Sequence, residues 1–322
     1  MRIRKLLRVR FVVDPFTEQE KIMAELTPMM QKYMETKEQY KDCILFYRLG
    51  DFYEMFFDDA LVASKELEIT LTGKSCGLEE RAPMCGIPYH AVEGYLSKLV
   101  SRGYKVAICE QVEDPKLAKG LVKREVIRVV TPGTNLNVQS LEAGKNNYLL
   151  SIAYTPDGIG ISAADVNTGD YYVTEVEDLK KLNDELMKYE PSEIICNEAF
   201  LVSGFDVNDL KSRLHISVNA LESHMFDDDG CRRILMKHFK VNTLIGLGVE
   251  EFPTGLLAAG ALLQYLYDTQ KTDLEHFTHI YPYLTSKYML LDSSTRRNLE
   301  LTETLREKQK RGSLLWVLDK TK

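Results

Sequence analysis

The hydrophobic pattern of the chain changes character between residues 131 and 147, and this change constrains the fold more than any other feature. Before it, short apolar runs alternate with helical stretches. After it, three runs typical of strands follow one another, joined by the turn sequences Thr-Pro-Asp-Gly at 155–158 and Asn-Thr-Gly at 167–169. Because strands alternating with helices and a meander of consecutive strands belong to different architectures, we expect at least two α/β units.

The first expected unit is predicted mainly by a short, aromatic-rich apolar run at 43–48 that Gly50 ends. A helix is expected over 51–65, with Asp51 as its N-cap and Glu54 three residues later in the capping-box position. A strand is expected next at 69–72, then a loop rich in Gly, Pro and Cys at 73–88 and a helix at 90–102. Two further strands are expected at 105–111 and 125–130.

The second expected unit begins with the meander, whose strands are predicted at 147–154, 158–166 and 170–176. A helix at 179–188 and a strand at 194–196 follow, an order typical of ribonuclease-H-like folds. From residue 255 the pattern predicts an almost entirely helical third unit, with a helix at 295–306. Its last apolar stretch, 314–318, has nothing after it to pack on, so we interpret this unit as incomplete.

Composition places the chain among ordinary globular proteins. It has 322 residues, 44% of them hydrophobic and 28% charged, and no apolar run approaches the roughly 18 residues that a membrane-spanning helix needs. The net charge of -7 is unusual for a nucleic-acid binder, but residues 145–255 carry -9 and residues 23–144 only -3. The charge distribution therefore does not exclude DNA contacts by the first unit. Shape and stacking would then have to supply the discrimination between DNA sites.

The cysteines and the first residues bear on where the chain resides. The six cysteines are dispersed, with no C-x-x-C pair and no His at ligand spacing, so neither a zinc site nor a disulfide framework is indicated. This favours reduced core thiols in a cytoplasmic protein. Residues 1–22 lack the pattern of a signal peptide. Because Met23 begins a stretch typical of the start of a globular protein, we interpret 1–22 as an extension outside the fold.

Five motifs, found in order along the chain, carry a resemblance to a known family. They are 46–56 (FYRLGDFYEMF), 83–93 (PMCGIPYHAVE), 106–111 (VAICEQ), 129–134 (VVTPGT) and 295–301 (TRRNLEL). Together they resemble the MutS family of bacterial DNA mismatch repair proteins, over residues 26–322. The resemblance implies a mixed-sheet mismatch-recognition domain at 23–134, a ribonuclease-H-like connector domain at 145–254 and the start of an all-α core domain at 255–322.

In this family an aromatic residue and a Glu two positions later recognise the mismatch, and the resemblance places these roles on Phe52 and Glu54. The ring stacks on a mispaired or unpaired base from the minor groove, and the carboxyl group hydrogen-bonds that base. A ring inserted at a base step must offset an unstacking cost of a few kcal/mol, and a mispair resists less because part of its pairing energy is already lost. An acid facing the phosphates also disfavours docking on matched DNA.

The resemblance implies further contacts around this pair. The family places segment 83–88 beside the wedge, which makes Met84 and Pro88 candidates for DNA binding. The basic candidates are Arg48, Lys119, Lys123 and Arg124. A solvated charged face accounts equally well for such basic residues.

Alternatives to this interpretation stay open at the level of sequence. Glu54 could be the capping partner of Asp51, with Phe52 and Phe56 both in the core, and exposure of the Phe52 ring decides between the two. The alternative function is a protein-interaction module of a repair complex, in which the connector passes conformational signals or docks a partner without autonomous DNA binding.

Other motifs predict no catalytic or metal site. The triplet Gly73-Lys74-Ser75 lacks the glycine five positions earlier that a phosphate loop needs, where the chain has Glu68. A nuclease needs a carboxylate on its first strand, but 147–154 has none and Asp165 stands alone. The acidic run Asp227-Asp228-Asp229 is predicted to begin a helix.

The resemblance also implies cofactors and partners. Intact members of the family bind ATP and Mg²⁺ through segments beyond the helical core, so this chain is expected to hold no cofactor and to be no ATPase. The expected partners are mismatched double-stranded DNA, a second copy in a homodimer and a MutL-type repair protein contacted through the connector, with no membrane. The expected location is the cytoplasm, at the nucleoid.

Overall fold

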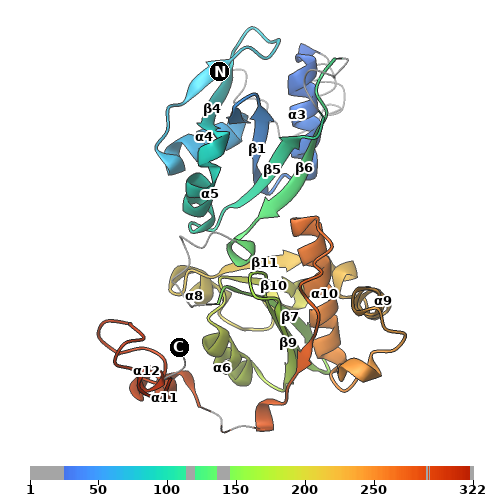
Figure 1. Ribbon diagram of the computed structural model, residues 1–322, viewed down its shortest axis with the longest axis vertical. Coiled ribbons are helices and arrows are strands. Elements are labelled where there is room, and N and C mark those ends of the chain that lie inside the picture. Colours follow the sequence, from blue (N-terminus) through green and yellow to red (C-terminus); the bar gives the residue numbers. More distant parts are fainter. Residues whose placement is uncertain (1–24, 114–119, 136–145, 288, 290, 320–322) are drawn as a thin grey trace. The chain divides into compact units, whose positions relative to one another are not determined.

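The computed structural model describes residues 25–113, 120–135, 146–287, 289 and 291–319 (Figure 1). The chain forms two compact units, residues 1–140 with 268–272 and residues 141–267 with 273–322, which we call the first and second domain. Among the described residues, each domain holds one six-stranded mixed sheet. The expected mixed α/β class is confirmed. The interpretation of residues 1–22 concerns a segment outside the described residues.

The sheet of the first domain has the strand order β3-β4-β2-β1-β5-β6, with β1 and β5 parallel and the other neighbours antiparallel. Because side chains alternate along a strand, each face buries its own cluster. Helix α3 covers one face through Met30 and Tyr33, and α4 and α5 cover the other through residues such as Ala63 and Leu99. The elements are α3 (Pro28–Gln39), β1 (Cys43–Leu49), β2 (Phe52–Phe56), α4 (Phe57–Leu67), β3 (Thr72–Lys74), β4 (Ala82–Pro88), η1 (Tyr89–Ala91), α5 (Val92–Val100), β5 (Lys105–Gln111), β6 (Arg124–Val130) and η2 (Pro132–Thr134).

The predicted helix at 51–65 is wrong over its first six residues. Residues 52–56 form strand β2, which pairs with β1 through Leu49 and Phe52, and α4 begins only at Phe57. Gly50 has φ +58° and is the first residue of the two-residue turn between these strands, a position that favours glycine. Asp51 is therefore a hairpin residue rather than an N-cap, and the capping explanation of Glu54 does not hold.

The predicted loop at 73–88 is also wrong, because most of its second half is a strand. Strand β2 pairs with β4 over the whole length of β2, from Phe52 opposite Pro88 to Phe56 opposite Met84. The short strand β3 pairs with the other edge of β4 and begins at Thr72, where we expected a strand to end. The predicted strand at 105–111 is confirmed, and that at 125–130 starts one residue earlier.

The meander of the second domain is confirmed within two residues at each end. Strands β7, β8 and β9 pair antiparallel in sequence, and β10 and β11 add parallel to β7, giving the order β11-β10-β7-β8-β9-β12. Helices α6, α7 and α8 cover one face, while α9 and α10 cover the other. The elements are β7 (Tyr148–Thr155), β8 (Gly158–Asp165), β9 (Asp170–Val176), α6 (Leu179–Tyr189), β10 (Glu193–Asn197), α7 (Glu198–Leu201), α8 (Val207–Ser212), β11 (Ser217–Leu221), η3 (Ser223–Phe226), α9 (Asp228–Phe239), η4 (Ile245–Leu247), α10 (Pro253–Gln270), β12 (Tyr281–Pro282), η5 (Thr285–Lys287), α11 (Ser293–Asn298) and α12 (Leu314–Leu318).

Helix α10, which we expected to open a separate helical unit at 255, lies instead in the core of the second domain. Its residues Leu256 and Leu263 share one buried cluster with Leu149 and Val173 of the sheet. The backbones approach so closely that a Cβ on Gly160 of β8 would lie 2.0 Å from the carbonyl oxygen of residue 254. Packing of the second domain thus continues past the expected boundary at 254.

The chain after α10 is less helical than predicted. Strand β12 joins the sheet edge beside β9, and the helix expected at 295–306 is only the short α11, which ends at Asn298. The apolar stretch 314–318 forms α12, and its five side chains are 42–70% exposed.

Several smaller expectations are settled by local geometry. Asp227 accepts a hydrogen bond from the Gly230 N–H at 2.9 Å, so the acidic run does begin helix α9. All six cysteines are free and buried. In the part of the chain that the structure describes, no helix has the length and apolar character needed to cross a membrane.

Candidate nucleic-acid interface

Phe52 is an exposed aromatic residue that directly follows the turn between β1 and β2. It is 46% exposed, whereas Phe56, four residues along the same face of β2, is 1% exposed under α3. Backbone pairing with β1 on one side and β4 on the other holds Phe52 between Leu49 and Pro88. The ring is thus presented from a strand fixed on both sides. This exposure excludes the alternative in which Phe52 lies in the core.

Glu54 lies two residues from Phe52 and on the same face of β2, about 7 Å along the strand. Its Oε2 forms an ion pair with Nζ of Lys74 at 2.6 Å, and the two side chains are 16% and 34% exposed. Lys74 stands on β3, so its side chain reaches Glu54 across the intervening strand β4. The carboxylate therefore has a positive partner in the protein that sequence reasoning did not provide.

Strand β4 supplies the surface beside this pair. Pro88 stands opposite Phe52, Gly86 opposite Glu54 and Met84 opposite Phe56, so the three share one face with the aromatic–acid pair. A Cβ on Gly86 would meet Cγ of Glu54 at 3.6 Å and Cδ1 of Phe52 at 3.9 Å. A side chain at Gly86 would therefore contact both the Phe52 ring and the Glu54 side chain. The structure thus brings Phe52, Glu54, Pro88 and Met84 together, with Met84 farthest from the ring.

Arg48 faces the other side of the sheet. It pairs in register with Tyr53, whose ring belongs to the cluster under α4 and α5, while Phe52 and Glu54 point away from that cluster. Its guanidinium lies 3.7 Å from the Tyr89 ring centroid and 3.4 Å from the Glu110 carboxylate. Burial and the Glu110 carboxylate raise the pKa of Tyr53, whose hydroxyl donates to Glu110. The structure does not place Arg48 beside the candidate wedge.

The other basic candidates differ in how they are held. Arg124 donates to the carbonyl oxygens of Arg48 at 2.7 Å and Val122 at 2.8 Å, contacts that fix strand ends. The Lys123 side chain is 66% exposed and pairs with Glu125 at 2.6 Å. Lys119 lies outside the described residues. Among the described basic candidates, Lys123 is the one whose side chain is held by an exposed ion pair.

The sequence did not lead us to Lys74 as a site residue. It belongs to the triplet Gly73-Lys74-Ser75, which we judged not to be a phosphate loop. In the structure the first two residues of the triplet stand on strand β3, and the Lys74 ammonium binds Glu54. The triplet therefore has neither the strand-to-helix turn nor the free lysine of a phosphate site. The lysine of this triplet is visible in the sequence as a candidate binding residue. Its pairing with Glu54, however, follows only from the register of the three strands.

Asp165, the single carboxylate considered for a nuclease, has a structural role. Its Oδ2 accepts the Asn147 N–H at 3.0 Å, and its Oδ1 accepts the Asn167 N–H at 2.8 Å. The side chain is 1% exposed. Across the described residues, no group of three or more His, Cys, Asp or Glu side chains is arranged to hold a metal ion.

Comparisons with known proteins agree with the two-domain division. The family model for MutS domain I matches residues 27–139, and that for MutS domain II matches residues 147–278. The second match runs past α10, as the packing of that helix requires. The fold thus defines a chain of two successive mixed α/β domains of the MutS type.

Relatives with the same printed name cover nearly all of the chain. The "DNA mismatch repair protein MutS" of Lachnoclostridium phytofermentans is 70% identical over 300 residues, 93% of this chain and 32% of the relative. Those of Ruminiclostridium cellulolyticum and Halothermothrix orenii are 54% and 48% identical over 93% of the chain, and the matches cover 34% and 33% of the relatives. The chain belongs to the MutS family. It spans about a third of the length of these relatives.

Proposed function

We propose that the chain binds mismatched double-stranded DNA in DNA mismatch repair through the face of β2 and β4 that carries Phe52. Phe52 enters a weakened base step from the minor groove and stacks on a mispaired or unpaired base. Glu54 hydrogen-bonds that base, and Pro88 and Met84 flank the pair. The observation that carries the proposal is the 46% exposure of Phe52 on the same strand face as Glu54.

The way in which Phe52 is held supports a wedge. A ring that must separate stacked bases works against a cost of a few kcal/mol, so it needs a backbone that does not yield. The residues around Phe52 pair with strands on both sides, and Tyr53 beside it is 5% exposed in the core. Ring insertion from such a support deforms the DNA rather than the protein. A mispaired step, which deforms more easily, is then the preferred site.

The pairing of Glu54 with Lys74 supports a role for the acid in selectivity. While the ion pair is intact, the face that meets the phosphates does not carry an isolated negative charge. A base that offers a donor to Glu54 competes with Lys74 for the same carboxylate oxygens. A matched duplex, in which the base edges stay paired and stacked, leaves the acid facing DNA without such a donor. A mismatched base thus gains a contact with Glu54 that a matched duplex does not, and the arrangement favours mismatched DNA over matched DNA.

The test uses a chimaera in which this chain replaces the matching third of the Lachnoclostridium phytofermentans relative. The affinities for a heteroduplex and its matched homoduplex are measured by fluorescence anisotropy at one stated salt concentration, for the parent chimaera and for Phe52→Ala. We expect Phe52→Ala to reduce the affinity ratio to near one, because the matched duplex gains little from the wedge. The control is Ile127→Ala on β6, since Ile127 is also 46% exposed on the same sheet.

The possible results separate cleanly. Loss of discrimination in Phe52→Ala with an unchanged ratio in Ile127→Ala supports the proposal. An unchanged ratio in Phe52→Ala, with the parent chimaera discriminating, refutes the wedge. The isolated chain is expected to bind either duplex weakly, and tight mismatch-specific binding by the chain alone would contradict that expectation. A homodimer, a MutL-type partner, nucleoid association and ATP with Mg²⁺ in segments other than these two domains stay expectations from the family resemblance.

A further inference from the structure

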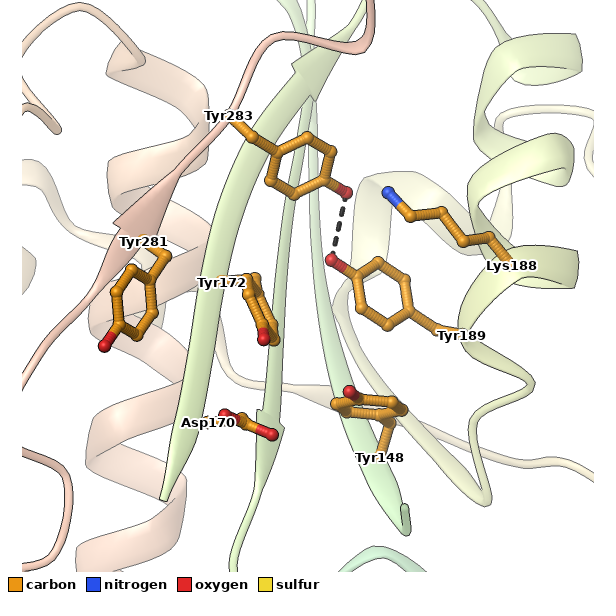
Figure 2. A pocket seen from close by; sticks show the side chains of 7 residues that line it. All are labelled: Tyr148, Asp170, Tyr172, Lys188, Tyr189, Tyr281 and Tyr283. Atoms are coloured by element: carbon orange, nitrogen blue, oxygen red, sulfur yellow. Dashed lines mark hydrogen bonds between the residues drawn. The ribbon is translucent and has the colours of Figure 1, made fainter. Parts of the chain in front are cut away.

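The second domain carries a pocket of about 570 Å³ on the sheet face that α6 covers (Figure 2). Five tyrosines line it, together with one acid and one lysine. Strands β7 and β9 provide Tyr148, Asp170 and Tyr172, the end of α6 provides Lys188 and Tyr189, and the segment of β12 provides Tyr281 and Tyr283. The last two lie beyond residue 278, where the match to the MutS domain II model ends. The pocket plays no part in the function proposed above.

The inner side of the pocket already holds a cation on an aromatic ring. Nζ of Lys188 lies 4.0 Å from the Tyr283 ring centroid and 3.0 Å from a Glu185 carboxylate oxygen. The Tyr283 hydroxyl donates to the same carboxylate at 2.5 Å, and the Tyr189 hydroxyl lies 3.1 Å from that of Tyr283. The charged and polar groups on this side of the pocket therefore already have partners among themselves. They also show that these rings accept a positive charge on their faces.

The outer side has rings and an acid without a cation among the described residues. Tyr172 and Tyr281 are partners in the parallel pairing of β9 and β12, with ring centroids 5.8 Å apart and planes inclined at 37°. Asp170, two residues before Tyr172 on the same face of β9, accepts hydrogen bonds from Asn146 and Thr168, both neutral side chains. Figure 2 shows the Asp170 carboxylate below the Tyr172 ring and the Tyr281 ring to the left of it. Tyr281 itself is 49% exposed.

We propose that this outer side binds an arginine side chain presented by a partner protein. A guanidinium is flat, stacks on tyrosine faces and donates charge-assisted hydrogen bonds to a carboxylate. Tyr172 and Tyr281 supply the ring faces, and Asp170, whose Oδ2 already accepts from Asn146 and Thr168, supplies its Oδ1 as acceptor. The second domain, residues 141–267 with 273–322, carries a net charge of -8, so a basic partner segment is attracted to it. The same charge disfavours a nucleotide, whose base would also stack on tyrosine but whose phosphate would face Asp170.

The experiment uses the full chain and two peptides, acetyl-Gly-Arg-Gly-amide and the same peptide with citrulline, which keeps the shape of arginine but carries no charge. Binding is followed by tyrosine-ring chemical shifts in NMR titrations. We expect saturable, millimolar binding of the arginine peptide, as one side chain on an open site allows, and no saturation with citrulline. Tyr281→Leu and Asp170→Asn should each weaken binding about tenfold, while Tyr281→Phe, which keeps the ring, should stay within about twofold.

Three results overturn the proposal. Equal binding of the citrulline peptide rules out recognition of charge. Saturable binding of deoxyadenosine monophosphate that Tyr281→Leu abolishes identifies a base-stacking site instead. Unchanged binding of the arginine peptide in Tyr281→Leu places it elsewhere on the domain. If Asp170→Asn perturbs the turn that Thr168 and Asn146 stabilise, the Leu and Phe variants of the exposed Tyr281 decide alone.

Discussion

The ammonium group of Lys74 and the carboxylate of Glu54 form an ion pair at 2.6 Å that crosses strand β4. The two residues are 20 positions apart in sequence, and neither side chain is fully exposed. An acid on a face proposed to meet DNA is thus balanced within the protein. The position of Lys74 therefore determines how much of the negative charge of Glu54 a DNA duplex encounters.

Lys74→Met should therefore destabilise the chain by about 1 kcal/mol, because Glu54 is left partly buried without its partner. Glu54→Gln in the same background should recover most of that loss. A double-mutant cycle measured by urea unfolding is expected to give a coupling free energy of about 1 kcal/mol. A coupling indistinguishable from zero would show that the pair contributes nothing to stability.

Phe52 and Phe56 offer a matched pair on one strand. Phe56 is 1% exposed and stacks edge-on against Tyr33 with ring centroids 4.9 Å apart, whereas Phe52 is 46% exposed. Phe56→Ala should lower the free energy of unfolding by about 3–5 kcal/mol, and Phe52→Ala by less than about 1 kcal/mol. Urea midpoints at constant m-value check this. Equal losses would mean that Phe52 is a core residue in solution.

Gly260 on α10 lies against Cys231 of α9. An added Cβ would come within 2.3 Å of the Cys231 Cβ and 2.5 Å of its Cα, closer than any relaxed side chain allows. Gly260→Ala should destabilise the second domain by at least about 2 kcal/mol, although alanine favours helix by about 1 kcal/mol. Amide exchange should speed up in β8 and α10 but not in β1 or β5. Gly246→Ala, with no atom within 4 Å of its Cβ, is the control, and equal effects of the two substitutions would contradict the close packing.

Stability should fall at alkaline pH. Burial raises the pKa of Cys85, Cys109 and Tyr148 to about 12, while the unfolded chain titrates near 8.5 for Cys and 10 for Tyr. Folding thus favours the protonated forms. Their contribution is complete below about pH 8 and is lost as the pH rises towards 12, since the unfolded chain then binds fewer protons. Urea midpoints from pH 7.5 to 10.5 should decrease, and a constant or rising midpoint would refute this.

Local sequence signals predicted the strands better than the junctions between elements. The meander and strand β5 were recovered because alternation and turn residues act within a few positions. Residues 51–54 carry a capping pattern and also fit a hairpin, and the choice depends on pairing with β4, about 30 residues away. Tertiary pairing overrode the local signal there. The same holds for α10, whose apolar sequence does not tell which sheet it covers.

The candidate site was predictable only in part for the same reason. Phe52 and Glu54 came from the family resemblance, and the register of β2 accounts for their common face. The partner Lys74 depends on the order of three strands, which no local pattern specifies. Arg48 was grouped with the basic candidates by residue type. Because its partner on β2 is Tyr53 and not Phe52, the Arg48 side chain lies on the opposite face of the sheet from Phe52.

The packing of α10 implies an order of events while the chain is being made. Leu149 and Val173 of the sheet share their core with Leu256 and Leu263, which follow them by about 80 residues or more. A ribosome adds about 5–20 residues per second, so this apolar face stays uncovered for several seconds until α10 emerges. The strands of the first domain are complete at Val130 and need not wait. The apolar sheet face of the second domain therefore stays uncovered longer during synthesis than the sheet of the first domain.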